Sequence, residues 1–250
     1  MPLRVVRGKG KPKSAPVRSG KAGKREAAAA EVAPGPVKRR RGKGPMSVRE
    51  EILRRGGARG DRWYNSVARA SEAFADDRER DAIRILRPVR QALPNAPSVR
   101  ELLGVSLYRA GQYKAAAEEL EAYAQITGEV DQHPVLMDCA RALRQPARVQ
   151  ELWNELAEVS PSSELVTEGR IVLAGTLADN DRLAEAVAML GRRASGTPKK
   201  IALHHLRLWY ALADLEERSG NLPRARILFD RIRRHEAGFA DVAERLAALG

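Results

Sequence analysis

Small and large apolar residues recur along this chain at fixed spacings. Five times, a small or medium apolar position is followed twelve residues later by a second one, and four residues after that by a large apolar residue. The sets are Ala70, Ala82 and Leu86; Gly104, Ala116 and Leu120; Met137, Val149 and Trp153; Ala174, Ala186 and Leu190; and Ala213, Ala225 and Phe229. They are offset by 34, 33, 37 and 39 residues. A repeat of this length predicts stacked helical hairpins, each built of a helix A and a helix B.

From Trp63 onward, apolar residues at helical spacing predict a helix A, a tight turn and a helix B in every module. Helix-stopping or helix-capping residues mark the five turns: Asp77, Gly111, Gln145 with Pro146, Asn180 with Asp181, and Gly220 with Asn221. Pro94, Pro161 and Pro198 fall where helix B should end. Pro88 lies inside the first helix B, where its missing N–H predicts a kink.

Two short helices are predicted at the ends of the array. Ser47 and Glu50 have the spacing of a capping box, which predicts a helix over about 47–55 that covers the first repeat. In the segment 239–249, Val242, Leu246 and Leu249 share one face, while Asp241, Glu244 and Arg245 are expected to face solvent. This pattern is typical of the terminal cap of a repeat array.

The basic charge of the chain is concentrated ahead of the repeats. Residues 1–62 hold 19 Lys and Arg against 5 Asp and Glu, although the net charge of the whole chain is +13. Residues 1–45 contain no aromatic residue, and we expect them to be a disordered basic arm. The predicted organisation is therefore an arm (1–45), a linker with a short helix (46–62) and a helical array (63–250).

These spacings resemble the tetratricopeptide repeat (TPR), most clearly in the second module, where Leu103, Gly104, Leu107, Gly111 and Ala116 match the family pattern. The resemblance implies an all-α, right-handed solenoid of about five TPR-like repeats with a C-terminal capping helix. The stretches HPVLMDCARAL (133–143), TEGRIVLAG (167–175), LRLWYALADLEERSG (206–220) and DVAERLAAL (241–249) also resemble uncharacterised TPR proteins of high-GC Gram-positive bacteria.

The resemblance further implies a binding groove lined by positions 2, 5, 9 and 12 of each helix A. Of the twenty residues at these positions, six are acidic and two are basic. The groove residues that we predict to bind a ligand are Tyr64, Glu101, Tyr108, Asp138, Glu168, Tyr210, Asp214 and Glu217. Acidic walls disfavour the clamp with which some TPR proteins hold a C-terminal carboxylate, and they favour a basic or amphipathic peptide or helix.

The basic arm offers two other interpretations. The run Lys38, Arg39, Arg40 and Arg41 could contact phosphates, so a nucleic-acid- or ribosome-associated protein is the alternative function. The same arm could instead fold back onto the acidic groove of its own chain, where it would be present at a high effective concentration.

Motifs for catalysis, metal binding or a cofactor are lacking in the sequence. It contains no Walker loop, no dinucleotide fingerprint and no His-Glu-x-x-His motif. His204 and His205 are adjacent, so their side chains are expected to diverge on a helix, and His133 has no evident partner. Cys139, the single cysteine, is expected to be a small buried hydrophobe. We therefore expect a cytoplasmic, non-catalytic interaction scaffold without metal or cofactor.

Overall fold

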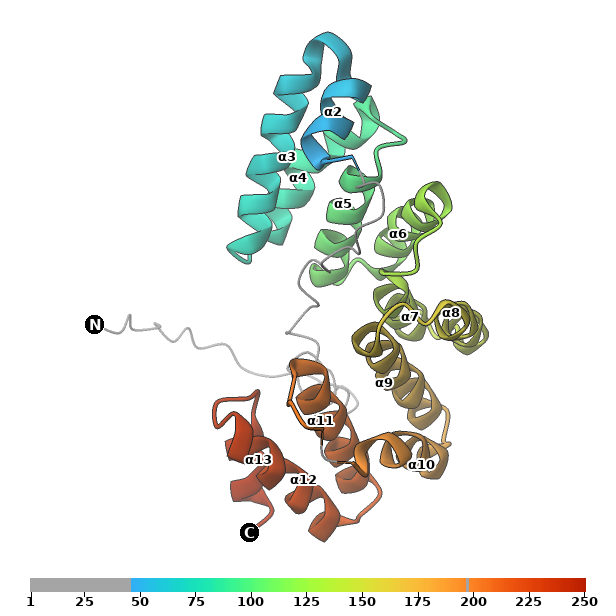
Figure 1. The fold of residues 1–250 in the computed structure, drawn as a ribbon, viewed down its shortest axis with the longest axis vertical. Coiled ribbons are helices and arrows are strands. Elements are labelled where there is room, and N and C mark those ends of the chain that lie inside the picture. Colours follow the sequence, from blue (N-terminus) through green and yellow to red (C-terminus); the bar gives the residue numbers. More distant parts are fainter. Residues whose placement is uncertain (1–45, 197) are drawn as a thin grey trace, which may run out of the picture. The chain divides into compact units, whose positions relative to one another are not determined.

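The computed structural model describes residues 46–196 and 198–250, and all regular structure in these residues is helical. The helices follow one another along the chain, from α2 in blue to α13 in red (Figure 1). They are α2 (Val48–Gly56), the short 3-10 turn η1 (Gly57–Arg59), α3 (Gly60–Ala75), α4 (Glu79–Ala92), α5 (Pro97–Arg109), α6 (Tyr113–Thr127), α7 (His133–Ala142), α8 (Pro146–Val159), α9 (Ser163–Asp179), α10 (Leu183–Ala194), α11 (Leu203–Arg218), α12 (Leu222–His235) and α13 (Val242–Ala248).

The five predicted hairpins are confirmed as α3–α4, α5–α6, α7–α8, α9–α10 and α11–α12. In each pair the two helices pack against each other, and helix B of one hairpin packs against helix A of the next. Each helix therefore contacts mainly its neighbours in the sequence, which is the arrangement of a repeat solenoid. Helix α4 continues through Pro88, which lies on its exposed side.

One backbone geometry closes all five hairpins. A residue with positive φ stands at each turn: Asp77 (+56°), Gly111 (+73°), Arg144 (+57°), Asp181 (+60°) and Gly220 (+85°). The next residue donates its N–H to a carbonyl five residues back, as from Arg78 to Ala73 at 2.8 Å and from Gln145 to Ala140 at 2.9 Å. This 6→1 bond defines a Schellman motif, which satisfies carbonyls at the end of helix A. In the third hairpin the left-handed residue is Arg144, one position before the predicted turn pair.

The spacing pattern places one residue on helix A and two on helix B of every hairpin. All of them are buried except Trp153, which is half-buried. Gly104 shows why some of these positions are small, because a Cβ on this residue would lie 2.6 Å from the Leu120 side chain. Close approach of the two helices at this position requires glycine unless Leu120 moves.

Both short end helices are present. Ser47 and Glu50 form the predicted capping box, and Ile52 of α2 is fully buried in the core of the first hairpins. At the other end, Val242 of α13 is buried as predicted. The expectation that Arg245 faces solvent is wrong: it is 5% exposed, and its guanidinium lies 4.9 Å from the centre of the Phe229 ring. Carboxylates on the preceding hairpin make this burial possible, as described below.

The turn geometry predicts that Arg144→Gly stabilises the protein. An L-residue pays an energetic cost in the left-handed region that glycine avoids, and the Arg144 side chain is exposed and bonds to none of the described residues. The expected gain in the free energy of unfolding is about 0.5 to 1 kcal/mol, measured by urea denaturation. The matched control is Gly111→Ala. The added Cβ would meet no atom within 4 Å, so the positive φ alone should destabilise this variant, and by a similar amount. A destabilised Arg144→Gly protein would contradict this account.

Candidate functional site

The predicted ligand-binding residues lie on the first helices of the hairpins. We call the surface formed by these positions the A-helix face. Tyr64 is on α3, Glu101 and Tyr108 are on α5, Asp138 is on α7, Glu168 is on α9, and Tyr210, Asp214 and Glu217 are on α11. Most of them contact the element that follows their hairpin, so the face is crossed by a series of polar bonds between successive repeats.

The junction between the second and third hairpins carries two such bonds. Tyr108 donates its hydroxyl to Asp138 Oδ2 at 2.6 Å, and Gln132 donates its side-chain amide to Glu101 Oε1 at 2.9 Å. Burial of Tyr108, together with the charge of Asp138, raises the pKa of the tyrosine. The phenol therefore stays protonated and keeps donating its hydrogen bond.

The fourth and fifth hairpins are joined by a buried ion pair. Glu168 on α9 lies 2.7 Å from an Nη of Arg207 on α11, and both side chains are nearly inaccessible to solvent. Burial raises the pKa of Glu168, while Arg207 acts in the opposite direction. Glu168 is 6% exposed, and its carboxylate points at Arg207. Its negative charge therefore pairs with an arginine of the same chain.

The last junction is held by Arg245 of α13. Its guanidinium lies 2.9 Å from Asp214 Oδ1 and 2.7 Å from Glu217 Oε2, and Tyr210 on the same helix α11 donates to Asp241 at 2.6 Å. Burial works to lower the pKa of Arg245, but the hydrogen bonds to Glu217 and Asp214 outweigh it and raise that pKa. Three of the predicted ligand-binding residues thus hold the end helix in place.

Several carboxylates lie near one another where α5, α6 and α7 meet. The hydroxyl of Tyr123 lies 2.9 Å from Glu129 Oε2 and 3.1 Å from Asp131 Oδ2. Burial raises the pKa of Tyr123, and the charges of Glu101, Asp131 and Glu129 raise it further. Glu101, Asp138 and Tyr108 are half-buried in this region, so part of each side chain is open to solvent.

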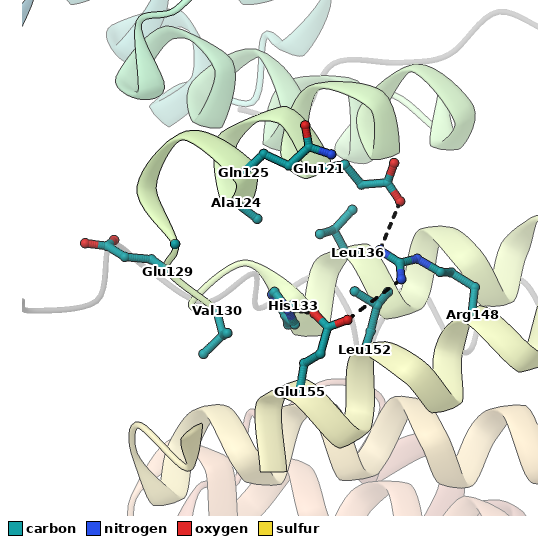
Figure 2. Close-up of a pocket in the computed structure, with 11 residues that line it drawn as sticks. Glu121, Ala124, Gln125, Glu129, Val130, His133, Leu136, Arg148, Leu152 and Glu155 are labelled. Atoms are coloured by element: carbon teal, nitrogen blue, oxygen red, sulfur yellow. Dashed lines mark hydrogen bonds and ion pairs between the residues drawn. The ribbon is translucent and has the colours of Figure 1, made fainter. Parts of the chain in front are cut away.

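A pocket of about 340 Å³ lies between α6, α7 and α8. Figure 2 shows Arg148 of α8 between two carboxylates, those of Glu121 and Glu155. An Nη of Arg148 is 3.4 Å from Glu121 Oε1, and the other is 3.9 Å from Glu155 Oε1. Burial works to lower the pKa of Arg148, but its bond to Glu151 and the charges of Glu121 and Glu155 raise it overall.

His133 lines this pocket and has the partner that the sequence did not reveal. Its Nε2 lies 2.8 Å from Glu155 Oε2, and the residue is 3% exposed. Glu155 stands 22 residues later on another helix, so no local motif links the two residues. The available signal was the spacing of Arg148, Glu151 and Glu155, which places three charged residues on one side of α8.

The other candidate chemical groups show no catalytic arrangement in the part of the chain that the structure describes. Cys139 is fully buried, as expected, and burial raises the pKa of its thiol to about 12. The expected divergence of His204 and His205 is wrong: their ring centres are 4.0 Å apart, because His205 turns back to accept the N–H of Ala202. Among the described residues, no group of three or more His, Cys, Asp or Glu could hold a metal ion.

Some predictions concern other parts of the chain. Lys38, Arg39, Arg40 and Arg41, together with the predicted disordered arm 1–45, lie outside the described residues. Within the described ranges, none of the helices has the length and apolar character needed to cross a membrane.

Comparison with known proteins supports the repeat fold. No protein-family model matches the chain, and no curated protein matches it in sequence. A solved thermophilic TPR protein of Thermus thermophilus superposes with a TM-score of 0.59 and 15% identity, over 75% of this chain and 98% of that one. YrrB, described as a TPR protein with an unusual peptide-binding site, gives a TM-score of 0.47 and 16% identity over 72% of this chain and 89% of its own.

The described residues therefore form an all-α helical-hairpin solenoid with a TPR-like fold. The resemblance to TPR proteins of high-GC Gram-positive bacteria stays a prediction.

The Tyr108–Asp138 bond predicts that Tyr108→Phe destabilises the protein. The substitution removes the hydroxyl donor of the half-buried Asp138 carboxylate and should cost about 1 kcal/mol of unfolding free energy in urea denaturation. Tyr64→Phe is the matched control, because the Tyr64 hydroxyl makes no hydrogen bond to the described residues. Equal losses in the two variants would show that the bond to Asp138 does not stabilise the junction.

The buried thiol predicts a slow reaction of native Cys139 with a thiol reagent. The pKa of the thiol is raised to about 12, so pH 8 lies well below it and the thiol is protonated. Only about one molecule in ten thousand then carries the reactive thiolate. Colour development with a disulfide reagent should be slow in buffer and fast in 6 M guanidinium. A rapid reaction of the native protein would mean that Cys139 is accessible.

Proposed function

We propose that this chain is a non-catalytic protein-interaction scaffold that binds a basic or amphipathic peptide or helix on the A-helix face. The observation that carries the proposal is the group of carboxylates where α5, α6 and α7 meet, beside the half-buried Tyr108. Carboxylates attract a cationic segment, and an aromatic ring supplies contact area at low entropic cost. The TPR-like fold is compatible with this function, since stacked repeats present extended binding surfaces.

The pairing of acidic residues across the junctions narrows the place where such a ligand would bind. Glu168 and Tyr210 are buried, and Asp214 and Glu217 face Arg245. Glu101, Tyr108 and Asp138 are only half-buried, so each leaves side-chain surface that a ligand can contact. We therefore place the ligand over the second and third hairpins, which carry these three residues.

The alternative function is association with nucleic acid or the ribosome through the basic arm. It rests on the 19 Lys and Arg among residues 1–62, and contacts of this kind are electrostatic and weaken with salt. The alternative function requires the arm, whereas binding on the A-helix face does not. Deletion of the arm therefore separates the two functions.

The test is a set of pull-downs from lysate with the full chain and with residues 46–250, each with and without nuclease. Partners that survive both arm deletion and nuclease support the scaffold, and the loss of every partner under either treatment supports the alternative. Charge reversal with Glu101→Arg should then remove the surviving partners. Glu158→Arg is the matched control, because Glu158 is exposed on α8 and forms no ion pair with the described residues. Retention of all partners by Glu101→Arg would refute binding on the A-helix face.

A further inference from the structure

The pocket between α6, α7 and α8 has an apolar lining below a charged rim. Ala124, Val130, Leu136 and Leu152 line it together with the polar residues shown in Figure 2. Its volume of about 340 Å³ is at the small end of the range for ligand sites, about 300 to 1,000 Å³. Such a volume suits one long side chain better than a folded element.

The charges of the rim favour a cation. Three carboxylates, those of Glu121, Glu129 and Glu155, line the pocket together with a single cation, Arg148. The charges of Glu121 and Glu155 help to raise the pKa of Arg148, so these carboxylates favour a charged guanidinium in the pocket. An anion entering the pocket would meet the same carboxylates at close range.

His133 adds a buried ring nitrogen to the pocket. Its Nε2 lies 2.8 Å from the Glu155 carboxylate, and its Nδ1 is buried and has no hydrogen-bond partner among the described residues. The pocket therefore combines a buried ring nitrogen without a partner, acidic acceptors on its rim and an apolar wall for methylene groups.

From this combination we infer that the pocket binds the side chain of an arginine or lysine of a partner protein. The aliphatic stem lies along Val130, Leu136 and Leu152, and the charged head reaches Glu121 and Glu155. The inference rests on the proposed scaffold function and adds a second contact for a basic partner, formed by residues other than those of the A-helix face. Lysine and arginine side chains commonly bury their stems in this way while the charge stays near polar groups.

The test uses a defined probe, the blocked tripeptide acetyl-Ala-Arg-Ala-amide, followed by ¹⁵N-correlation NMR of the full chain at low salt. The control probe replaces arginine by citrulline, which has the same shape and no charge. We expect saturable shifts at Val130, His133 and Glu155 with the arginine probe and at least fivefold weaker binding of the citrulline probe. Equal binding of the two probes, or shifts confined to other residues, would overturn the inference.

Variants of the pocket sharpen the result. Glu155→Gln keeps an acceptor for His133 and should weaken the arginine probe about fivefold, which is a typical loss for one partly exposed charge pair. Glu158→Gln, one turn further along α8, should leave the affinity unchanged. Arg148→Gln removes the competing cation and should strengthen binding. Weaker binding to Arg148→Gln, or stronger binding of an Ala-Asp-Ala probe, would identify the pocket as an anion site instead.

The same experiment separates this inference from the proposed function. Glu101→Arg changes the A-helix face and should leave tripeptide binding in the pocket intact. If Glu155→Gln has no effect on the probe while Glu101→Arg removes partners from lysate, the scaffold function stands and the pocket is not its contact. If the pocket binds the probe and Glu101→Arg retains every partner, the A-helix face is the part that fails.

Discussion

Close contact between the two helices of each hairpin is the constraint on which the rest of the structure depends. The absence of a side chain at Gly104 lets Leu120 of helix B pack directly onto helix A, and Ala70 is fully buried at the corresponding position of the first hairpin. Loss of this contact would leave each hairpin without a buried face, because each repeat has only its neighbours to pack against. The five left-handed turn residues follow from the same constraint, since they bring helix B back along helix A within a few residues.

The fold could be predicted because helix packing within a hairpin requires residues of particular sizes at fixed spacings in the sequence. The spacing of Ala82 and Leu86, or of Ala225 and Phe229, is a helical spacing inside one element, and the repeat offsets join the elements in order. The turns at Gly111 and Gly220 could also be predicted, because glycine favours the positive φ that both residues adopt. The left-handed conformation of Arg144 could not, because arginine is not a typical turn residue. The 6→1 bond from Gln145 to Ala140 closes the turn in which Arg144 adopts it.

The contacts of the candidate binding surface were harder to predict because they join residues that are distant in the sequence. Mapping the repeat positions located Glu168 and Glu217 on the correct helices, but it could not show that Arg207 and Arg245 face them. Arg245 was assigned to solvent since a short amphipathic helix normally exposes its charges. The pocket around His133 was missed for the same reason, as its three walls come from different helices.

Helix α13 has a consequence for the design of the array. Arg245 satisfies Asp214 and Glu217 from outside the last hairpin, in the way that Gln132 reaches back to Glu101 between the second and third hairpins. A helix of seven residues thus reproduces the polar half of a repeat interface without supplying a second helix of its own. Extending this protein by grafted repeats would therefore require an incoming hairpin with a guanidinium at the position of Arg245, because an uncharged residue there would leave two carboxylates without their shared cation.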